Sequence, residues 1–153
     1  MTLSGLLKPE LILLKTACVS KDELIIRLVE AAYSAEQELP LSKDDLLQNI
    51  YTREKIGGTM LPSGLSLPHA RLKNFDGFVI TLGTSQNQII HEEIKLGLMA
   101  LMISSQTGGS YYLPAIAAMT KISRDNEYFS RLCAADNAED FICILRGRDP
   151  EVA

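Results

Sequence analysis

The sequence predicts a layered α/β domain, in which helices pack against a β-sheet. Three observations support this prediction. The 153 residues are enough to close one hydrophobic core without disulfide bonds. Apolar residues recur at helical spacing near both ends of the chain, and extended apolar segments lie between them. No repeat or linker divides the sequence, so we expect one domain over residues 1–150.

Two capped helices are expected in the first third of the chain. Ser20 and Glu23 have the spacing of a capping box, and the apolar positions that follow predict an amphipathic helix to about Glu38. Ser42 is a second N-cap, and acidic residues follow it where a helix N-terminus favours negative charge. The second helix is expected to end near residues 53–55, before a pair of glycines.

Extended segments are expected mainly in the middle of the chain. A short apolar segment at 11–14 precedes the first helix, and 65–67 is a short strand candidate. Residues 78–85 and 94–104 are rich in strand-forming side chains and predict two longer strands. Three strands with helices before and after them are typical of a layered α/β domain.

The C-terminal part is predicted to be helical. A loop over 104–112 is followed by a helix with Pro114 in its first turn, a position that proline tolerates. A short helix is expected over 126–135 and a C-terminal helix over 137–147. The last residues, 148–153, are expected to be a frayed tail.

Composition and charge restrict the class of protein. Hydrophobic residues make up 46% and charged residues 22% of the chain, which is typical of soluble globular proteins. The net charge of −4 argues against a nucleic-acid-binding protein, which usually carries a basic surface. Segment 94–104 is too short to span a bilayer, and the N-terminus lacks the cationic region of a signal peptide. We therefore expect a cytoplasmic protein.

The three cysteines predict no disulfide framework. Cys18, Cys133 and Cys143 are odd in number, and none of them forms a CxxC pair. Such cysteines are typical of reduced thiols that pack in a core. We expect the three cysteines to pack in the core, and we expect the protein to bind neither a metal nor a cofactor.

The stretch GGTMLPSGLSLPHARL, residues 57–72, presents His69, one of only two histidines in the chain. A metal site would need further ligands nearby, whereas the neighbours of His69 are Pro68, Ala70 and the cationic Arg71. A catalytic triad would need an activated nucleophile, and no GxSxG elbow is present. The remaining chemical option is that the imidazole itself takes up a group.

The surroundings of His69 favour an anionic group. Residues 53–73 carry a local charge excess of +3 in a chain whose net charge is −4. Three glycines allow backbone amides to approach an anion, and Thr59 and Ser66 can donate hydroxyl hydrogen bonds to phosphoryl oxygens. A glycine-rich turn before an edge strand, with His69 half-buried at its end, is the simpler explanation, and composition alone favours it.

Taken as one unit, REKIGGTMLPSGLSLPHAR, residues 53–71, resembles the signature of the IIA phosphocarrier domains of the bacterial phosphoenolpyruvate:sugar phosphotransferase system. The resemblance is to the fructose/mannitol branch, which includes nitrogen-regulatory members. Ser66 stands where that family usually has alanine. The residues that match at the same spacing are Arg53, Glu54, Thr59, Gly64, Leu65, Leu67, Pro68, His69, Ala70 and Arg71.

The resemblance implies a fold and an activity. The fold is a single-domain three-layer sandwich, a mixed β-sheet flanked by helices on both sides. His69 would accept phosphate from HPr or a homologue and pass it to a cysteine of a IIB domain, without a metal or cofactor. Arg53 would help to hold the phosphoryl group. From the residues themselves, we also expect Thr59, Ser66 and Arg71 to support it. Such a protein is a phosphotransferase component rather than a stand-alone enzyme, and it can make peripheral contact with a membrane transporter.

The same resemblance leaves a regulatory alternative open. Nitrogen-regulatory members bind target proteins according to their phosphorylation state, without passing phosphate on to a sugar. Adding about two negative charges at His69 would reverse the local charge excess, which is enough to gain or lose a partner surface.

Two positions depart from the family pattern. Tyr112 stands where family members commonly have a second active-site histidine, and it can still donate a hydrogen bond to phosphate or to the ring of His69. Ser63 stands where mannitol-type members carry a carboxylate. The other histidine, His91, does not match the second family histidine, and we expect it in a solvated loop.

Overall fold

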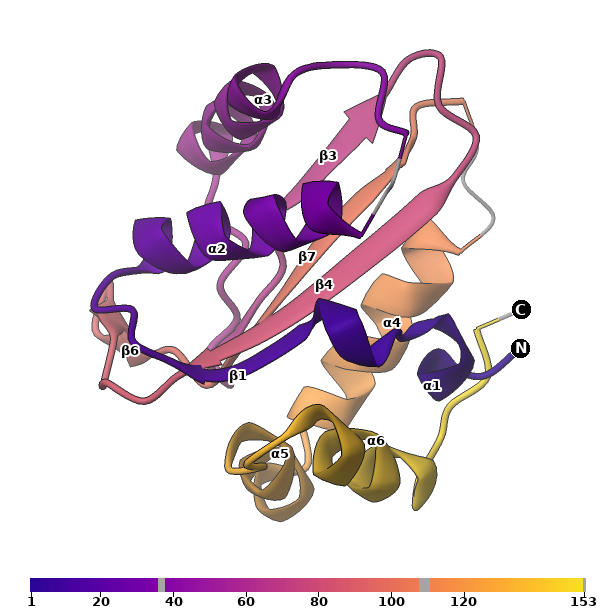
Figure 1. Ribbon diagram of the computed structural model, residues 1–153. Coiled ribbons are helices and arrows are strands. Elements are labelled where there is room, and N and C mark those ends of the chain that lie inside the picture. Colours follow the sequence, from indigo (N-terminus) through magenta and orange to yellow (C-terminus); the bar gives the residue numbers. More distant parts are fainter. Residues whose placement is uncertain (36–37, 108–110, 153) are drawn as a thin grey trace.

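A five-stranded mixed sheet lies between two layers of helices (Figure 1). The computed structural model describes residues 1–35, 38–107 and 111–152. The strands of the sheet are β1 (Ile12–Thr16), β2 (Leu65–Ser66), β3 (His69–Leu72), β4 (Phe78–Ser85) and β7 (Leu98–Ser105). The predicted α/β sandwich with helices on both sides of a mixed sheet is therefore confirmed.

The order of the strands places the two short ones at an edge. β4 lies between β1 and β7, parallel to β1 and antiparallel to β7. β2 and β3 both pair in parallel with the outer edge of β7, and His69 lies opposite Met102 in that register. Because side chains alternate along a strand, His69 and Arg71 lie on one face of the sheet, and Ala70 and Leu72 on the other.

Each face of the sheet is covered by its own helices. On one face lie α2 (Lys21–Ser34) and α3 (Lys43–Ile56), and on the other α1 (Leu3–Leu6), α4 (Tyr112–Ser123), α5 (Asn126–Cys133) and α6 (Ala138–Arg146) (Figure 1). The predicted N-caps are confirmed, because Ser20 accepts a hydrogen bond from the Glu23 amide and Ser42 from the Asp45 amide.

Two hydrophobic cores fill the space between these layers. Leu24, Leu28 and Ile50 pack on the α2–α3 face against Ala70 and Met99 of the sheet. The second core joins side chains of the opposite face to α4, α5 and α6, and its fully buried members include Leu65, Leu82, Leu98 and Phe141. The position of His69 on the second face therefore brings it to the α4 side of the sheet.

The predicted strand over 94–104 proves to be two strands. β6 (Ile94–Lys95) pairs with β5 (Ile90–His91) in a separate hairpin, and β7 begins only at Leu98. Gly97 separates them, because its amide donates to the carbonyl of Gly64 at 2.8 Å and turns the chain into the sheet. The expected loop position of His91 was therefore wrong, since His91 lies in β5 with its side chain 39% exposed.

Several predicted boundaries also differ. β3 was missed as a strand, and a short 3-10 turn at Pro9–Leu11 precedes β1. α2 ends at Ser34, and Glu38 lies outside any helix, while part of the predicted helix end falls on residues 36–37, outside the described residues. The predicted loop 104–112 begins inside β7 and ends inside α4, and residues 108–110 of it are likewise outside the described residues.

The expected frayed tail is instead packed against the N-terminus. The Leu3 amide donates to the Pro150 carbonyl at 2.8 Å, and Thr2 and Glu151 form a β-bridge. Val152 is only 2% exposed. Figure 1 shows the two ends of the chain side by side, and these contacts fix residues that the sequence alone gave no reason to order.

The cysteines occupy three different environments. All three are free thiols: Cys18 is buried, Cys133 is half-buried and Cys143 is exposed. The expected core role is therefore wrong for Cys143. Over the described ranges, none of the helices combines the length and apolar character that crossing a membrane requires.

Candidate functional site

His69 begins β3 with its ring half-buried on the α4 side of the sheet. Its Nδ1 lies 3.2 Å from the carbonyl oxygen of Leu67. Because a carbonyl can only accept a hydrogen bond, Nδ1 carries the proton and Nε2 keeps its lone pair in the neutral ring. Nε2 is therefore the nitrogen of His69 that is able to act as a nucleophile.

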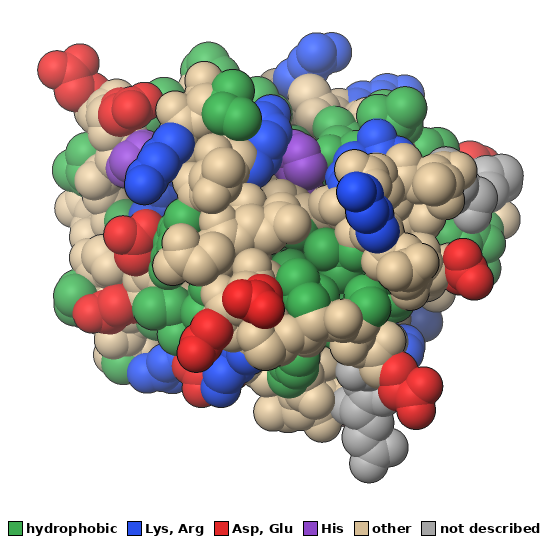
Figure 2. All heavy atoms as spheres, turned by 90° about the horizontal axis from the view of Figure 1, so that it is seen from above, with side chains coloured by type: hydrophobic (Ala, Val, Ile, Leu, Met, Phe, Trp, Pro, Cys, Tyr) green, Lys and Arg blue, Asp and Glu red, His purple; other side chains and the backbone are tan. Residues whose placement is uncertain are grey.

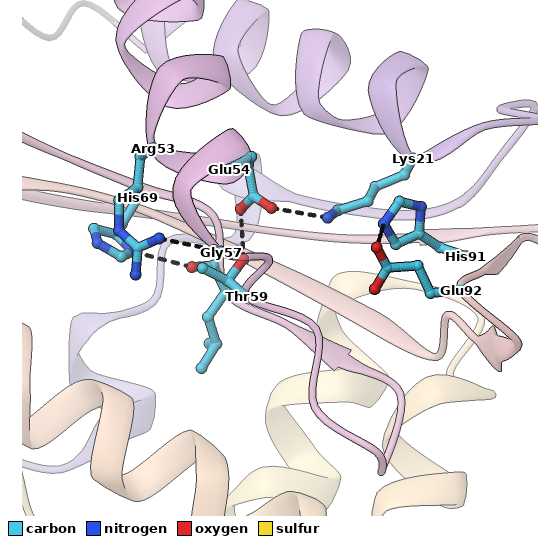
Figure 3. Close-up of polar contacts among 9 residues, drawn as sticks. Lys21, Arg53, Glu54, Gly57, Thr59, His69, His91 and Glu92 are labelled. Atoms are coloured by element: carbon cyan, nitrogen blue, oxygen red, sulfur yellow. Dashed lines mark hydrogen bonds and ion pairs between the residues drawn. The ribbon is translucent and has the colours of Figure 1, made fainter.

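Arg53 brings a guanidinium to this ring from the last turn of α3. Its Nη1 donates a hydrogen bond to the carbonyl oxygen of Gly57 at 2.8 Å. Figure 3 draws the Arg53 and His69 side chains in the same place, and the charge of Arg53 is close enough to lower the pKa of the imidazole. Lys and Arg side chains also lie beside the two histidines on the face shown in Figure 2. The structure therefore brings the two principal predicted site residues together.

Tyr112 and Arg71 complete the surroundings of the imidazole. The ring of Tyr112, in the first turn of α4, lies 5.3 Å from the ring of His69 at an angle of 58°. The guanidinium of Arg71 lies over the ring of Tyr112, with its Cζ 4.8 Å from the ring centroid. Burial raises the pKa of Tyr112 even though Arg71 and Arg53 oppose this change. Tyr112 therefore keeps its phenolic proton near neutral pH and can donate it in a hydrogen bond.

The environment also favours the neutral form of His69. Burial is the main cause that lowers the pKa of His69, and the positive charges of Arg53 and Arg71 lower it further. The hydrogen bond to Leu67 and the nearby carboxylate of Glu54 act in the opposite direction but do not compensate. A neutral imidazole beside two guanidiniums is suited to attack an anionic phosphoryl donor.

We expect the imidazole of His69 to titrate below the usual histidine value of about 6.5. Because its folded-state pKa is lowered, its contribution to stability is present above the unfolded value and is lost as pH falls through the folded value. NMR titration of the His69 ring protons measures the folded-state pKa directly. An inflection above about 6.5 would contradict the buried, cation-flanked environment.

The two hydroxyl groups predicted to donate hydrogen bonds to phosphate, those of Thr59 and Ser66, lie in different environments. The Thr59 hydroxyl donates to Oε1 of Glu54 at 2.5 Å, so in this structure it is engaged by a carboxylate. Ser66 is fully buried, and its Oγ has no hydrogen-bond partner among the described residues. Ser66 pairs with Met99, a member of the core on the α2–α3 face. The structure therefore does not bring Ser66 to the phosphoryl side of His69.

Sequence reasoning missed the role of one ion pair beside the site. Nζ of Lys21 lies 2.9 Å from Oε2 of Glu54, and their side chains are only 9% and 12% exposed. Glu54 belongs to the Arg-Glu pair of the motif, but Lys21 lies in a separate helix, and no spacing in the sequence links it to the site. Over the residues that the structure describes, no group of histidines, cysteines and carboxylates could hold a metal ion.

Comparison with known proteins gives a family match over nearly the whole chain. The family model described as phosphoenolpyruvate-dependent sugar phosphotransferase system, EIIA 2, matches residues 5–147. A curated relative, the nitrogen regulatory protein of Bradyrhizobium diazoefficiens, is 24% identical over 148 residues, which cover 95% of each chain.

Solved structures agree with the fold described above. The nitrogen regulatory protein IIA-Ntr from Neisseria meningitidis has a TM-score of 0.76 at 19% identity, covering 93% of this chain and 97% of its own. The mannitol enzyme IIA from Escherichia coli, solved in complex with phosphorylated enzyme IIB, has a TM-score of 0.71 at 20% identity and covers 93% and 98%.

Proposed function

The chain belongs to the EIIA 2 family of the phosphoenolpyruvate-dependent sugar phosphotransferase system, and from this premise we propose that it is a phosphohistidine carrier that accepts phosphate on His69. The observation that carries the proposal is the geometry of the imidazole. Leu67 holds the proton on Nδ1, so that Nε2 bears a lone pair, and the guanidinium of Arg53 is close enough for its charge to lower the pKa of the ring.

The transfer is a displacement at phosphorus. The lone pair of Nε2 forms a bond to the phosphorus of a phosphohistidine on an HPr-like donor, while the bond from phosphorus to the donor nitrogen breaks and leaves its electron pair there. In the next step a cysteine thiolate of a IIB domain attacks the phosphorus, and the bond to Nε2 breaks. Arg53 and Arg71 supply positive charge for the phosphoryl oxygens, and Tyr112 supplies a hydroxyl donor.

The proposed partners follow from this sequence of steps. The donor is an HPr-like phosphocarrier, and the acceptor is a IIB domain. The mannitol enzyme IIA of similar fold was solved together with its phosphorylated IIB partner, which supports an acceptor of this class. His69 is half-buried rather than fully enclosed, which suits two protein partners that must reach the same nitrogen in turn.

A second candidate is a regulatory protein that binds targets according to its phosphorylation state. The relatives named as nitrogen regulatory proteins favour it, as does the replacement of the second family histidine by Tyr112. Phosphorylation would place about two negative charges against Arg53 and Arg71 and would change the charge of this surface.

One experiment separates the two candidates. The protein is first phosphorylated with phosphoenolpyruvate, Enzyme I and HPr, and is then mixed with a IIB domain. Loss of phosphate from His69 together with its appearance on the IIB cysteine supports the carrier. If phosphate stays on His69 while candidate regulatory targets bind only one of the two states, the regulatory role holds and the carrier role fails.

Replacing Tyr112 by phenylalanine is expected to slow phosphorylation of His69 by about fivefold, the effect of losing one hydrogen-bond donor. The aromatic contacts with His69 and Arg71 remain in this variant. Tyr111→Phe is the matched control, because the Tyr111 ring packs on Phe78 instead of on His69. Initial rates with phosphorylated HPr measure both, and equal rates for the two variants would show that the Tyr112 hydroxyl does not contact the phosphoryl group.

A further inference from the structure

A chain of hydrogen bonds runs from α2 to the imidazole of His69. It begins at Lys21, the first residue of α2, whose Nζ lies 2.9 Å from Oε2 of Glu54 in α3. It continues from Oε1 of the same carboxylate to the hydroxyl of Thr59 at 2.5 Å. Figure 3 shows Glu54 between these two partners, with Arg53 and His69 beside them.

The backbone carries the chain onward from Thr59. Its carbonyl accepts a hydrogen bond from the Leu67 amide at 3.1 Å, and the carbonyl of Leu67 accepts from Nδ1 of His69 at 3.2 Å. Met60 and Ser66 form the adjoining β-bridge, so the segment that contains Thr59 forms an outer edge beside β2. The position of the Leu67 carbonyl therefore depends on where the Thr59 segment is held.

We propose that Glu54 and Thr59 are positioning residues, which hold the Leu67 carbonyl so that His69 keeps its proton on Nδ1 and presents Nε2 to the phosphoryl donor. This inference rests on the proposed phosphorylation of His69. Lys21, Glu54 and Thr59 act on the reacting nitrogen only through Leu67 and the choice of ring tautomer. Lys21 in turn fixes the carboxylate of Glu54.

The ion pair is well suited to this task because it is nearly buried. Burial alone would raise the pKa of Glu54, but the hydrogen bonds from Thr59 and Lys21 outweigh it and hold that pKa below the usual range. The carboxylate is therefore ionised and acts as a permanent acceptor. A hydrogen bond to an ionised acceptor is stronger than a neutral one, and it orients the Thr59 hydroxyl in a single direction.

The neighbouring Arg53 depends on the same segment. Its guanidinium donates to the carbonyl of Gly57, two residues before Thr59. Anchoring Thr59 to Glu54 therefore limits the movement of the turn that orients Arg53 as well as that of the carbonyl that orients His69. The guanidinium of Arg53 and the imidazole of His69 therefore both depend on the position of the segment that contains Thr59.

Thr59→Val tests the proposal, since it removes the hydroxyl while keeping the shape of the side chain and both charges of the ion pair. Nitrogen NMR of the His69 ring reports the tautomer, and initial rates with phosphorylated HPr report the function. We expect the fraction of the Nδ1-protonated tautomer to fall and the rate to fall about fivefold. Thr59→Ser, which retains a hydroxyl, is expected to restore both.

Thr16→Val is the matched control for loss of a threonine hydroxyl. Thr16 is the last residue of β1, at the opposite edge of the sheet from β3, and its Oγ1 donates to the Thr84 carbonyl of β4. It should leave the His69 tautomer and the rate unchanged. If Thr59→Val leaves the tautomer as in the unmodified protein, the positioning role is wrong even if the rate falls.

A double variant, Lys21→Met with Glu54→Gln, tests the ion pair without a single change that could prevent folding. It removes both charges together, so no buried charge is left without its partner. The glutamine can still accept from Thr59, and we therefore expect a smaller loss of the Nδ1-protonated tautomer than in Thr59→Val. A larger loss would overturn the proposed order of contacts.

These outcomes are distinct from a failure of the proposed function. If the unmodified protein takes up no phosphate on His69, the carrier proposal fails while the tautomer measurements still stand. If the unmodified protein is phosphorylated and Thr59→Val matches it in tautomer and rate, only the positioning role fails.

Discussion

Replacing His69 by glutamine is expected to abolish phosphorylation by phosphoenolpyruvate, Enzyme I and HPr. Glutamine has an amide in place of the imidazole, and its amide nitrogen has no lone pair that can attack phosphorus. Because the nucleophile itself is lost, the acid-labile phosphate should disappear rather than decrease. The measurement is incorporation of labelled phosphate, compared before and after treatment with acid.

His91→Gln is the natural control for this experiment. The chain has two histidines, and His91 lies in the β5–β6 hairpin, where its Nε2 faces Glu92 at 3.9 Å. Figure 3 shows it on the far side of Glu54 and Lys21 from His69. This variant should be phosphorylated like the unmodified protein. Phosphate retained in His69→Gln but lost in His91→Gln would assign the acceptor to the hairpin and overturn the proposed site.

Much of the scaffold could be predicted from the sequence because its signals are local. The serine caps at Ser20 and Ser42 and the strand 78–85 depend on residues within one helix turn or one strand, and the structure confirms them. The strand division near Gly97 could not be predicted, because it depends on a hydrogen bond to Gly64, which lies far away in the sequence. The order of residues 149–152 likewise depends on contacts with the first residues of the chain.

The site shows the same division between local and distant causes. His69 and Arg53 were predicted because both belong to one motif, and the structure places them next to each other. The orientation of Ser66 into the opposite face depends on strand register with β7, which the motif does not specify. The role of Lys21 depends on how α2 packs against α3, so the sequence carried no sign of it.

Gly64→Ala is expected to lower the free energy of unfolding by about 3 kcal/mol, which is large for a single methyl group. Gly64 has a φ of +93°, a conformation that residues with a β-carbon rarely adopt. The new β-carbon would also lie 2.6 Å from the carbonyl oxygen of Lys95 and 3.2 Å from the amide nitrogen of Gly97. Both are backbone atoms, so neither can swing away as a flexible side chain would.

Gly57→Ala is the matched control, since it makes the same chemical change in the same motif. Gly57 has an extended φ of 176°, and a β-carbon there would meet nothing within 4 Å. Its free energy of unfolding should change by no more than about 0.5 kcal/mol. Urea unfolding of the two variants measures the difference, and equal stabilities would show that the contact with Lys95 does not constrain Gly64.

The Gly64→Ala variant also distinguishes between two explanations of why the motif contains a glycine at position 64. The sequence suggested that this glycine allows backbone amides to approach an anion. In the structure its carbonyl accepts hydrogen bonds from the amides of Gly97 and Leu98, so it fastens the motif to the start of β7. Gly64→Ala should therefore reduce the amount of folded protein, whereas the molecules that remain folded should take up phosphate at His69. A fully folded variant with no phosphate uptake would instead place Gly64 at the phosphoryl site.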